Sequence, residues 1–362
     1  MKIIAFYLPQ YYPTPHNNEW WGEGFTEWTN VAKARKLFPG HYQPKIPADL
    51  GFYDLRVPEV REKQAKMAQS AGIYGFCYYH YWFGGGQQEL ELPFHEVVDS
   101  GKPDFPFCLC WANETWSRRF WSMDGLSVSK KTLIEQQYLG KDDDVAHFQS
   151  LLPAFRDFRY IKVDGKLLFM IYKPLNFPDI DVFIKRWNQL AKDNGLEGFY
   201  FVGYSLQIKD EYDQIKGLGF DGVCSCRIRR YKKRGVSWFL KKIFCCITRI
   251  PEIYSYKKVY PTLIGEEEVA CNDVFPTIIP NWDHTARCGY NGYLFHQSTP
   301  ELFEKHAQDV LGKIQGKDET TNLCFLKSWN EWGEGNYMEP DMRYQWGYLL
   351  ALKKAIDSIK KK

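Results

Sequence analysis

The sequence predicts an α/β protein, built as a single (β/α)8 TIM barrel with long loops at the carboxyl ends of its strands. Eight short apolar runs, rich in β-branched and aromatic residues, recur along the 362 residues. They are almost continuously apolar, as expected of parallel strands that are buried on both faces. Helical patterns separate the runs, and long polar and aromatic segments follow several of them directly. This alternation is typical of a (β/α)8 barrel.

The apolar runs predict the strands in chain order. They cover residues 2–7, 75–79, 105–111, 167–172, 199–204, 219–225, 274–280 and 323–328. Apolar residues at helical spacing predict helices at residues 58–70, 180–194, 299–314 and 342–359. An open, doubly wound sheet is the alternative fold, but no GxGxxG or P-loop motif follows any of the strands. We therefore expect residues 1–362 to form one barrel domain with a basic insert at about 226–262.

The basic insert has an unusual charge for its length. Residues 226–262 hold eleven lysines and arginines against one acid, Glu252, which gives a net charge of +10. Apolar residues recur at helical spacing over 236–247, so we expect an amphipathic helix with basic flanks. The helix either packs its apolar face on the barrel or contacts an anionic membrane surface or a lipid-linked, phosphate-bearing glycan. No nucleic-acid partner is expected, because no known binding motif accompanies the basic residues.

Composition limits the class of protein. The 13 Trp, 24 Tyr and 25 Phe exclude long disordered tails and collagen-like repeats. No run of 18 apolar residues predicts a transmembrane helix, and the first apolar run ends at Leu8, too soon for a signal peptide. The ten cysteines include no CxxC pair, which favours free buried thiols in a reducing compartment. We expect a cytoplasmic protein, peripheral at the inner face of the membrane if the insert binds lipid.

Polar and aromatic residues gather directly after the predicted strands. The segments are HYWFGGG after the second strand, ANETWSRRFW after the third, NWDHTAR after the seventh and WNEWGEGNYMEPD after the eighth. Barrel enzymes build their active sites at these strand ends. Tryptophan and tyrosine rings suit the apolar faces of sugars, while Asn, Glu, His and Arg pair with hydroxyls. A carbohydrate is therefore the expected ligand, although nucleotide bases also stack on aromatic rings.

The strongest local signal is SWNEWGEG, residues 328–335, which follows the last predicted strand. It places Glu331 and Glu334 three residues apart on a turn that contains two glycines. Paired carboxylates cleave glycosidic bonds, because one protonates the leaving oxygen while the other acts as base or nucleophile. We predict that Glu331 and Glu334 are the catalytic pair. Glu339, five residues further on, is expected to matter much less for turnover.

Several motifs follow one another over nearly the whole chain. They are FYLPQYYP, EWWGEGFTEWTNV, HYQPKIPADLGFYDLR, GFCYYHYWF, CWANETW, PNWDHTAR and SWNEWGEGNYMEPD. Together they resemble the WbsX-type proteins of the glycoside hydrolase family 99-like group, which are associated with bacterial polysaccharide biosynthesis. The resemblance implies a barrel enzyme, a glycosidase or glycosyltransferase, that acts on a bacterial surface polysaccharide such as an O-antigen, or on its precursor.

The same resemblance implies roles for the two glutamates. Family 99 contains endo-acting α-mannosidases whose key motif is similar to Glu-Trp-His-Glu-Gly. Carried over, its first glutamate falls on Glu331, the base that acts on the sugar's own 2-hydroxyl, and its second falls on Glu334, the general acid/base. This sequence departs from the hydrolases at Gly333, where they carry histidine, and at residues 7–10, where they carry a YYPWY-like run.

Further residues are expected to bind the sugar, because they follow a predicted strand or fall in the motifs that carry the resemblance. They are Tyr7, Gln10, Trp21, Glu27, Trp28, His80, Tyr81, Trp82, Trp111, Asn113, Glu114, Tyr172, Trp282, Asp283, Asn330 and Trp332. No metal site and no cofactor are expected, since no HxxxH or HExxH spacing is present. Two other functions stay open: a metal-dependent polysaccharide hydrolase or deacetylase, and a sugar-binding barrel without catalysis.

Overall fold

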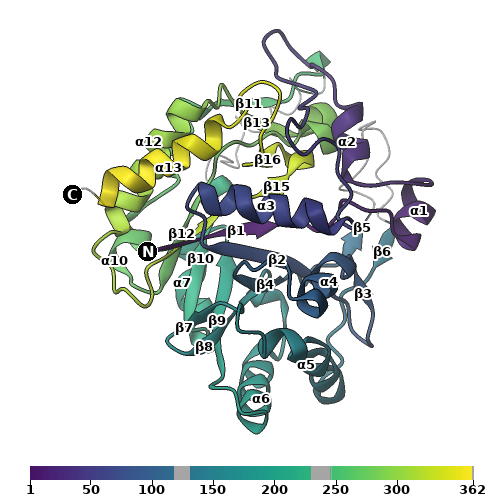
Figure 1. Ribbon diagram of the computed structural model, residues 1–362, viewed down its shortest axis with the longest axis vertical. Coiled ribbons are helices and arrows are strands. Elements are labelled where there is room, and N and C mark those ends of the chain that lie inside the picture. The colour runs from purple at the N-terminus through teal and green to yellow at the C-terminus, as the bar shows by residue number, and fades with distance from the viewer. Residues whose placement is uncertain (118–130, 230–244, 246, 361–362) are drawn as a thin grey trace.

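The computed structural model describes residues 1–117, 131–229, 245 and 247–360. Within these residues eight parallel strands form a closed barrel (Figure 1). In order around the barrel they are β1 (Lys2–Tyr7), β2 (Gly75–Trp82), β4 (Phe107–Trp111), β8 (Lys166–Ile171), β9 (Phe199–Ser205), β10 (Gly222–Ser225), β12 (Val274–Ile278) and β14 (Leu323–Leu326). β14 pairs with β1, and β1 pairs with β2, which closes the ring. The predicted (β/α)8 fold is confirmed.

Helices cover the outside of the barrel and connect successive strands (Figure 1). The longer ones are α3 (Pro58–Ser70), α4 (Leu92–Ser100), α5 (Lys141–Phe155), α6 (Ile180–Asp193), α7 (Ile208–Gly217), α12 (Pro300–Ile314) and α13 (Gly347–Lys360). Short helices lie in the connections: α1 (Pro15–Trp21), α2 (Glu27–Lys33), α9 (Tyr256–Val259), α10 (Glu266–Ala270) and α11 (Thr285–Cys288). Additional short strands are β3 (Gln88–Glu89), β5 (Trp116–Ser117), β6 (Thr132–Ile134), β7 (Lys162–Val163), β11 (Glu252–Ser255), β13 (Tyr293–His296), β15 (Asn330–Glu331) and β16 (Asn336–Tyr337).

The predicted elements agree closely with the observed ones, except at the start of the last helix. Each predicted strand matches a barrel strand to within three residues at either end. The last helix begins at Gly347, five residues later than predicted. The reason is a turn that precedes it: Asp341 Oδ1 accepts hydrogen bonds from the backbone N–H groups of Arg343 and Tyr344 at 2.9 and 2.6 Å. An aspartate that bonds to nearby backbone in this way competes with helix formation.

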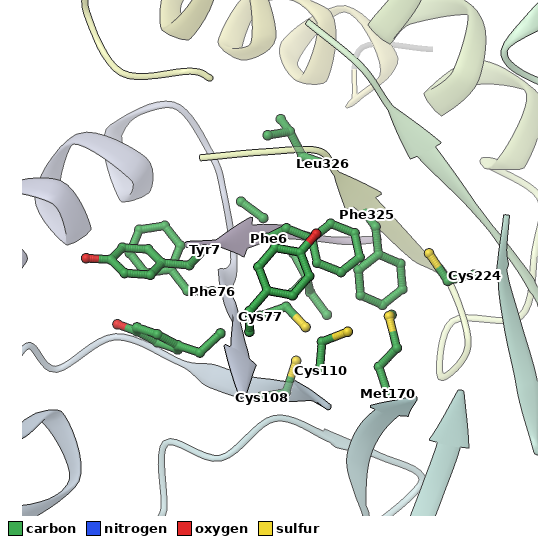
Figure 2. Packing of buried hydrophobic residues seen from close by; sticks show 14 of the residues in the cluster. Phe6, Tyr7, Phe76, Cys77, Cys108, Cys110, Met170, Cys224, Phe325 and Leu326 are labelled. Atoms are coloured by element: carbon green, nitrogen blue, oxygen red, sulfur yellow. The ribbon is translucent and has the colours of Figure 1, made fainter. Parts of the chain in front are cut away.

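Strand side chains alternate between the barrel interior and the helix layer. Phe6 of β1 lies inside, where its ring stands 5.5 Å from the rings of both Tyr79 and Phe325. Cysteines and Met170 fill the space beside these rings, as Figure 2 shows. Tyr7, the next residue along β1, points to the other side and packs on Tyr78, with ring centroids 4.5 Å apart. The side of the strand on which a residue lies therefore decides whether it can reach the barrel interior.

Much of the basic insert, residues 230–244 and Cys246, lies outside the described residues. Most of the amphipathic helix predicted over 236–247 therefore lies outside them too. Of the apolar face predicted for that helix, the described Ile247 has 77% of its surface exposed. Arg227, one of the eleven basic residues, is buried and forms ion pairs with Glu267 and Glu268. No helix in the described part of the chain is long and apolar enough to cross a membrane. The described cysteines are free thiols, all buried or half-buried.

Candidate active site

Glu331 follows the end of β14 and is held by two neighbours in the same segment. Its Oε2 atom accepts hydrogen bonds from Lys327 Nζ at 2.8 Å and from Ser328 Oγ at 2.7 Å. Lys327 Nζ also donates to the hydroxyl of Tyr79 at 2.9 Å. Burial lowers the pKa of Lys327, but Glu331, together with Tyr204, Tyr172 and Glu334, outweighs burial and raises that pKa well above its usual value. A buried cation thus lies against one oxygen of Glu331.

Glu334 lies on the short 3₁₀ turn that follows, and its side chain keeps 16% of its surface exposed. Its Oε1 atom accepts a hydrogen bond from Arg287 Nη1 at 2.7 Å, and His284 Nε2 lies 3.7 Å from the same oxygen. Arg287 also donates through Nε and Nη2 to the two oxygens of Glu27, at 2.9 and 3.1 Å. Arg287 on α11 therefore joins Glu27 on α2 to Glu334 after β14.

Each glutamate of the predicted pair uses one oxygen for protein contacts. Within the described residues, both hydrogen bonds to the Glu331 carboxylate go to Oε2. Within the same residues, the contacts of Glu334 with Arg287 and His284 both go to Oε1. Oε1 of Glu331 and Oε2 of Glu334 are therefore the oxygens that remain for a substrate. Two anchored carboxylates, each with one oxygen left over, can take up or give a proton without moving their side chains.

Four tyrosines surround this pair at the mouth of the barrel: Tyr79, Tyr81, Tyr172 and Tyr204. Tyr172 stacks on Tyr204 with ring centroids 4.7 Å apart, and Tyr79 meets the Tyr172 ring edge to face at 6.1 Å. Burial raises the pKa of all four hydroxyls, so they stay neutral. Neutral phenols can both donate and accept hydrogen bonds, which suits sugar hydroxyls.

A cavity of about 370 Å³ opens beside the tyrosines, at the ends of β4, β8 and β9. Tyr172, Tyr204, Glu114 and Lys173 all line it, and Lys173 Nζ lies 4.7 Å from the centroid of the Tyr172 ring. Lys173 Nζ is 3.1 Å from Glu114 Oε1, and the Glu114 side chain is 45% exposed. The structure thus brings six predicted residues to one region at the mouth of the barrel: Glu27, Tyr81, Glu114, Tyr172, Glu331 and Glu334.

Gly333, between Trp332 and Glu334, lies where no side chain fits. A Cβ atom at this position would overlap the carboxylate of Glu27 and would come within 2.9 Å of Arg287 Nε. The Glu27–Arg287 ion pair therefore occupies the space next to the turn. This arrangement gives a physical reason for glycine at the position where the family 99 hydrolases carry histidine.

Four predicted substrate contacts are corrected, because their side chains point to the helix layer. Tyr7 donates its hydroxyl hydrogen to Gln64 Oε1 on α3 at 2.7 Å. His80 Nε2 lies 2.8 Å from His147 Nε2 on α5. The other two pack around the same histidine: the Trp82 ring stacks on His147 at 4.6 Å and the Trp111 ring meets it at 4.8 Å. Strand alternation explains the error, because Tyr79 and Tyr81 occupy the inner positions of β2.

Two other predicted residues lie near the barrel mouth, but their side-chain amides already form hydrogen bonds with the backbone. Asn330 bonds to both backbone polar groups of Leu8, at 2.7 and 3.0 Å. Asn113 bonds in the same way to the backbone of Lys173, at 2.7 and 3.0 Å. These amides fix the ends of neighbouring strands relative to each other. Their role in the structure is to hold the scaffold of the site.

The predicted tryptophans of the loops also serve mainly as scaffold. Trp28 Nε1 donates to the carbonyl of Tyr53 at 2.7 Å. Trp332 stacks on Tyr337 with centroids 3.7 Å apart, and its Nε1 donates to Glu339 Oε2 at 2.6 Å. Trp21, at the end of α1, is half-buried and lies 5.8 Å from the ring of Phe25.

Three remaining predicted residues occupy the neighbouring loops. Gln10 is buried, and its carbonyl accepts a hydrogen bond from the backbone N–H of Glu27 at 3.1 Å. Asp283 is buried and uses both carboxylate oxygens on protein donors. Trp282 and Asp283 line a second cavity rather than the one beside the tyrosines. In the described part of the chain, no three metal-ligating side chains converge.

Sequence reasoning missed Lys327, Arg287, Tyr79 and Tyr204. A signal for Lys327 was present, because it stands two residues after Phe325 and so on the same, inner side of the strand. Arg287 had no such signal, since its partner Glu27 is 260 residues away in the chain. Glu339 is fully buried and accepts from Gln64 Nε2 at 2.6 Å and Tyr53 Oη at 2.9 Å, and the expectation that it matters less for turnover stays a prediction.

The chain matches curated relatives along almost its whole length. It is 33% identical over 355 residues to the uncharacterized protein WxcX of Xanthomonas campestris pv. campestris strain B100, a match of 98% of this chain and 49% of the relative. The WxcX protein of strain ATCC 33913 is likewise 33% identical, with the same coverage. The chain thus spans about half the length of the curated relatives it matches.

Solved structures share the fold. The GH99 endo-alpha-mannosidase from Bacteroides thetaiotaomicron is similar with a TM-score of 0.59 and 17% identity, over 99% of this chain and 97% of that chain. A glycoside hydrolase-like protein is similar with a TM-score of 0.57 and 17% identity, over 98% and 93%. A family model described as "Glycosyltransferase WbsX" matches residues 3–352. The chain therefore belongs to the WbsX glycosyltransferase family.

Proposed function

We propose that this protein is a glycoside-processing enzyme that breaks or transfers a glycosidic bond with Glu331 and Glu334 as its catalytic pair. The observation that carries the proposal is the pair of anchored carboxylates at the barrel mouth, each with one oxygen left over for a substrate. Family membership supports the reaction class. The substrate we propose is a bacterial surface polysaccharide or its precursor, as the family resemblance implies.

The two carboxylates receive different roles in this proposal. Glu331 takes the proton of the sugar's 2-hydroxyl, and the freed oxygen attacks the anomeric carbon as the bond to the leaving group breaks. Glu334 gives its proton to the leaving oxygen and then takes one from the incoming acceptor, whose oxygen attacks the anomeric carbon. The bond between that carbon and the 2-oxygen breaks at the same time, and Glu331 returns its proton to the 2-oxygen. Lys327 supports the first role, because its ammonium group lies 2.8 Å from Glu331 Oε2 and holds the carboxylate in place while Oε1 stays available. Arg287 supports the second, because it stabilises the carboxylate that Glu334 becomes after it gives up its proton.

Hydrolysis and transfer differ only in the acceptor. Water completes hydrolysis, whereas a sugar hydroxyl completes transfer, and the same proton movements serve both. The cavity of about 370 Å³ beside Tyr172 offers room for an acceptor sugar next to the glutamates. Its Lys173 and Glu114 supply polar groups for hydroxyls.

Turnover of Glu331→Gln and Glu334→Gln variants tests the proposal. A panel of fluorescently labelled α-linked oligosaccharides serves as substrate, with chromatography to separate shortened products from extended ones. We expect each variant to lose about 10² to 10⁴ in turnover while it still binds the glycan. Glu59→Gln, an exposed acid on α3, is the matched control and should keep full activity. If both catalytic-pair variants keep more than about a tenth of wild-type activity, the assignment is wrong.

We further propose that the basic insert brings the enzyme to the cytoplasmic face of a membrane or to a lipid-linked glycan. The net charge of +10 over residues 226–262 supports this idea, and the exposed Ile247 agrees with it. Co-sedimentation with vesicles that contain anionic lipid, at low salt, tests it. Failure to bind such vesicles would exclude the membrane and leave the proposed catalysis untouched.

A further inference from the structure

A second cavity, of about 300 Å³, lies next to the candidate active site and shares its supporting loops. Its lining includes neither catalytic glutamate and none of the four tyrosines at the barrel mouth. Two lining residues hold the turn that carries Glu334. The backbone N–H of Asp283 donates to the carbonyl of Glu334 at 2.7 Å, and Lys45 Nζ donates to the carbonyl of Gly335 at 3.2 Å. The two sites are therefore neighbours with separate walls.

The two carboxylates of this cavity already accept hydrogen bonds from the protein. Asp283 accepts from His41 and Gln43 through Oδ2, at 3.0 and 2.8 Å, and from Thr285 through Oδ1. Asp341 accepts from the Tyr337 hydroxyl through Oδ2 at 2.5 Å and from two backbone N–H groups through Oδ1. These carboxylates have little capacity left for the donors of a ligand.

Donors of the same cavity, in contrast, keep unused capacity. The guanidinium of Arg343 lies 4.8 Å from the ring of Tyr42 and 5.2 Å from that of Tyr344, and it pairs with no carboxylate among the described residues. Lys45 is buried, and its hydrogen bond within the described residues goes to one backbone carbonyl. Trp282 Nε1 is buried and, within the same residues, has no acceptor. An excess of hydrogen-bond donors, among them the permanently charged guanidinium of Arg343, favours a ligand that is rich in acceptors and carries a negative charge.

The walls of the cavity are largely aromatic. Trp282, Tyr337, Tyr344 and Tyr348 all line it. Aromatic rings pack on the apolar faces of pyranose rings, and a volume of about 300 Å³ is within the range of small-molecule sites. Ring walls combined with surplus cationic donors suit a sugar that carries an acidic group.

We propose that this cavity binds an acidic sugar, a pyranose that bears a carboxylate or a phosphate, with the acidic group against Arg343 and Lys45. Trp282 Nε1 donates to an oxygen of the same ligand. Because Asp283 and Lys45 also hold the turn of Glu334, the bound sugar lies directly behind the catalytic glutamates. The cavity is thus a binding site for an acidic sugar beside the turn that carries Glu334. This inference concerns binding and does not depend on which residues are catalytic.

Isothermal titration calorimetry with three monosaccharides tests the proposal. The ligands are D-glucuronate, D-glucose 6-phosphate and neutral D-glucose. We expect at least one acidic sugar to bind at least tenfold more tightly than glucose, and more weakly as salt is raised, because salt screens the exposed Arg343. Comparing the first two ligands distinguishes a carboxylate from a phosphate as the recognised group.

Three single substitutions test whether the acidic sugar binds in this second cavity. Arg343→Gln should weaken the acidic sugar at least tenfold and leave glucose unchanged, since Arg343 is exposed and its loss leaves the fold intact. Arg156→Gln, which changes another exposed arginine directly after the end of α5, is the matched control and should bind normally. Glu331→Gln should also bind normally, which separates this site from the catalytic pair. The proposal is overturned if neither acidic sugar outperforms glucose, if Arg343→Gln has no effect, or if Glu331→Gln abolishes the binding.

Discussion

The carboxylate of Glu27 fills the space that a side chain at Gly333 would need. A Cβ atom at position 333 would come within 2.6 Å of the carboxyl carbon of Glu27, closer than real Cβ contacts allow. Glu27 is fully buried there and is held by two hydrogen bonds from Arg287. Because position 333 has no side chain, Glu27 has room to bind Arg287, and Arg287 in turn binds Glu334. A histidine at this position and the Glu27–Arg287 ion pair exclude each other.

Gly333→Ala should disturb the site even though it adds one methyl group. The methyl displaces Glu27, and overpacking of this kind typically costs about 1–3 kcal/mol. Turnover should fall at least tenfold, because Arg287 then loses its position against Glu334. Gly312→Ala on α12, where a Cβ meets nothing within 4 Å, is the control and should leave both stability and turnover unchanged or improved. Equal behaviour of the two variants would contradict the steric argument.

Lys327→Met should destabilise the protein strongly, and Glu331→Gln should repair part of the loss. Removing one partner of a buried ion pair leaves an uncompensated charge and costs about 3–5 kcal/mol. In the double variant no buried charge is left alone, so its free energy of unfolding should exceed that of Lys327→Met. Urea denaturation of the wild type, both single variants and the double variant measures the coupling. Simple additivity of the two losses would show that the pair at 2.8 Å is energetically unimportant.

The stability of the protein should fall as pH rises from about 5 to 7, in part through Glu339. Burial raises the pKa of Glu339 to about 7, although Trp332, Gln64 and Tyr53 all donate hydrogen bonds to it. A carboxyl that binds its proton more tightly in the folded state than in the unfolded state stabilises the fold at low pH. This stabilisation is lost as pH rises between the unfolded and the folded pKa.

Glu339→Gln isolates this contribution. Its free energy of unfolding should depend less on pH between 5 and 7 than that of the wild type, by about 2 kcal/mol for a shift of this size. Urea titrations at pH 5, 6, 7 and 8 give both curves. Parallel curves would mean that Glu339 does not titrate in this range. Turnover of the same variant also checks the sequence-based expectation that Glu339 matters much less to catalysis than Glu331 and Glu334.

Two tyrosine variants separate the barrel interior from the helix layer. Tyr7→Phe removes a buried hydroxyl that donates to Gln64, so it should cost about 1 kcal/mol of stability and leave turnover within twofold. Tyr172→Phe removes a hydroxyl on the cavity beside the glutamates, so it should raise KM severalfold with little change in stability. Steady-state kinetics and thermal melts of both variants check this. A larger kinetic effect for Tyr7→Phe would restore that residue to the binding site.

The sequence by itself determined the order and the positions of the barrel strands. This was possible because buried parallel strands need local apolar runs, and because turns and helices separate those runs within a few residues of chain. It also determined that Glu331 and Glu334 stand together, since both follow one strand on a short turn. Such features depend on neighbours in the chain, and a pattern read along the chain can record them.

Only the tertiary structure decided which side chains meet. Strands that are apolar on both faces carry no signal for inside and outside, so Tyr7 and His80 were expected in the site although Phe6 and Tyr79 occupy the inner positions. The Glu27–Arg287 pair joins residues 260 positions apart, and closure of the barrel brings them together. Contacts of this kind depend on the packing of several loops at one end of the barrel, and no local spacing in the chain encodes them.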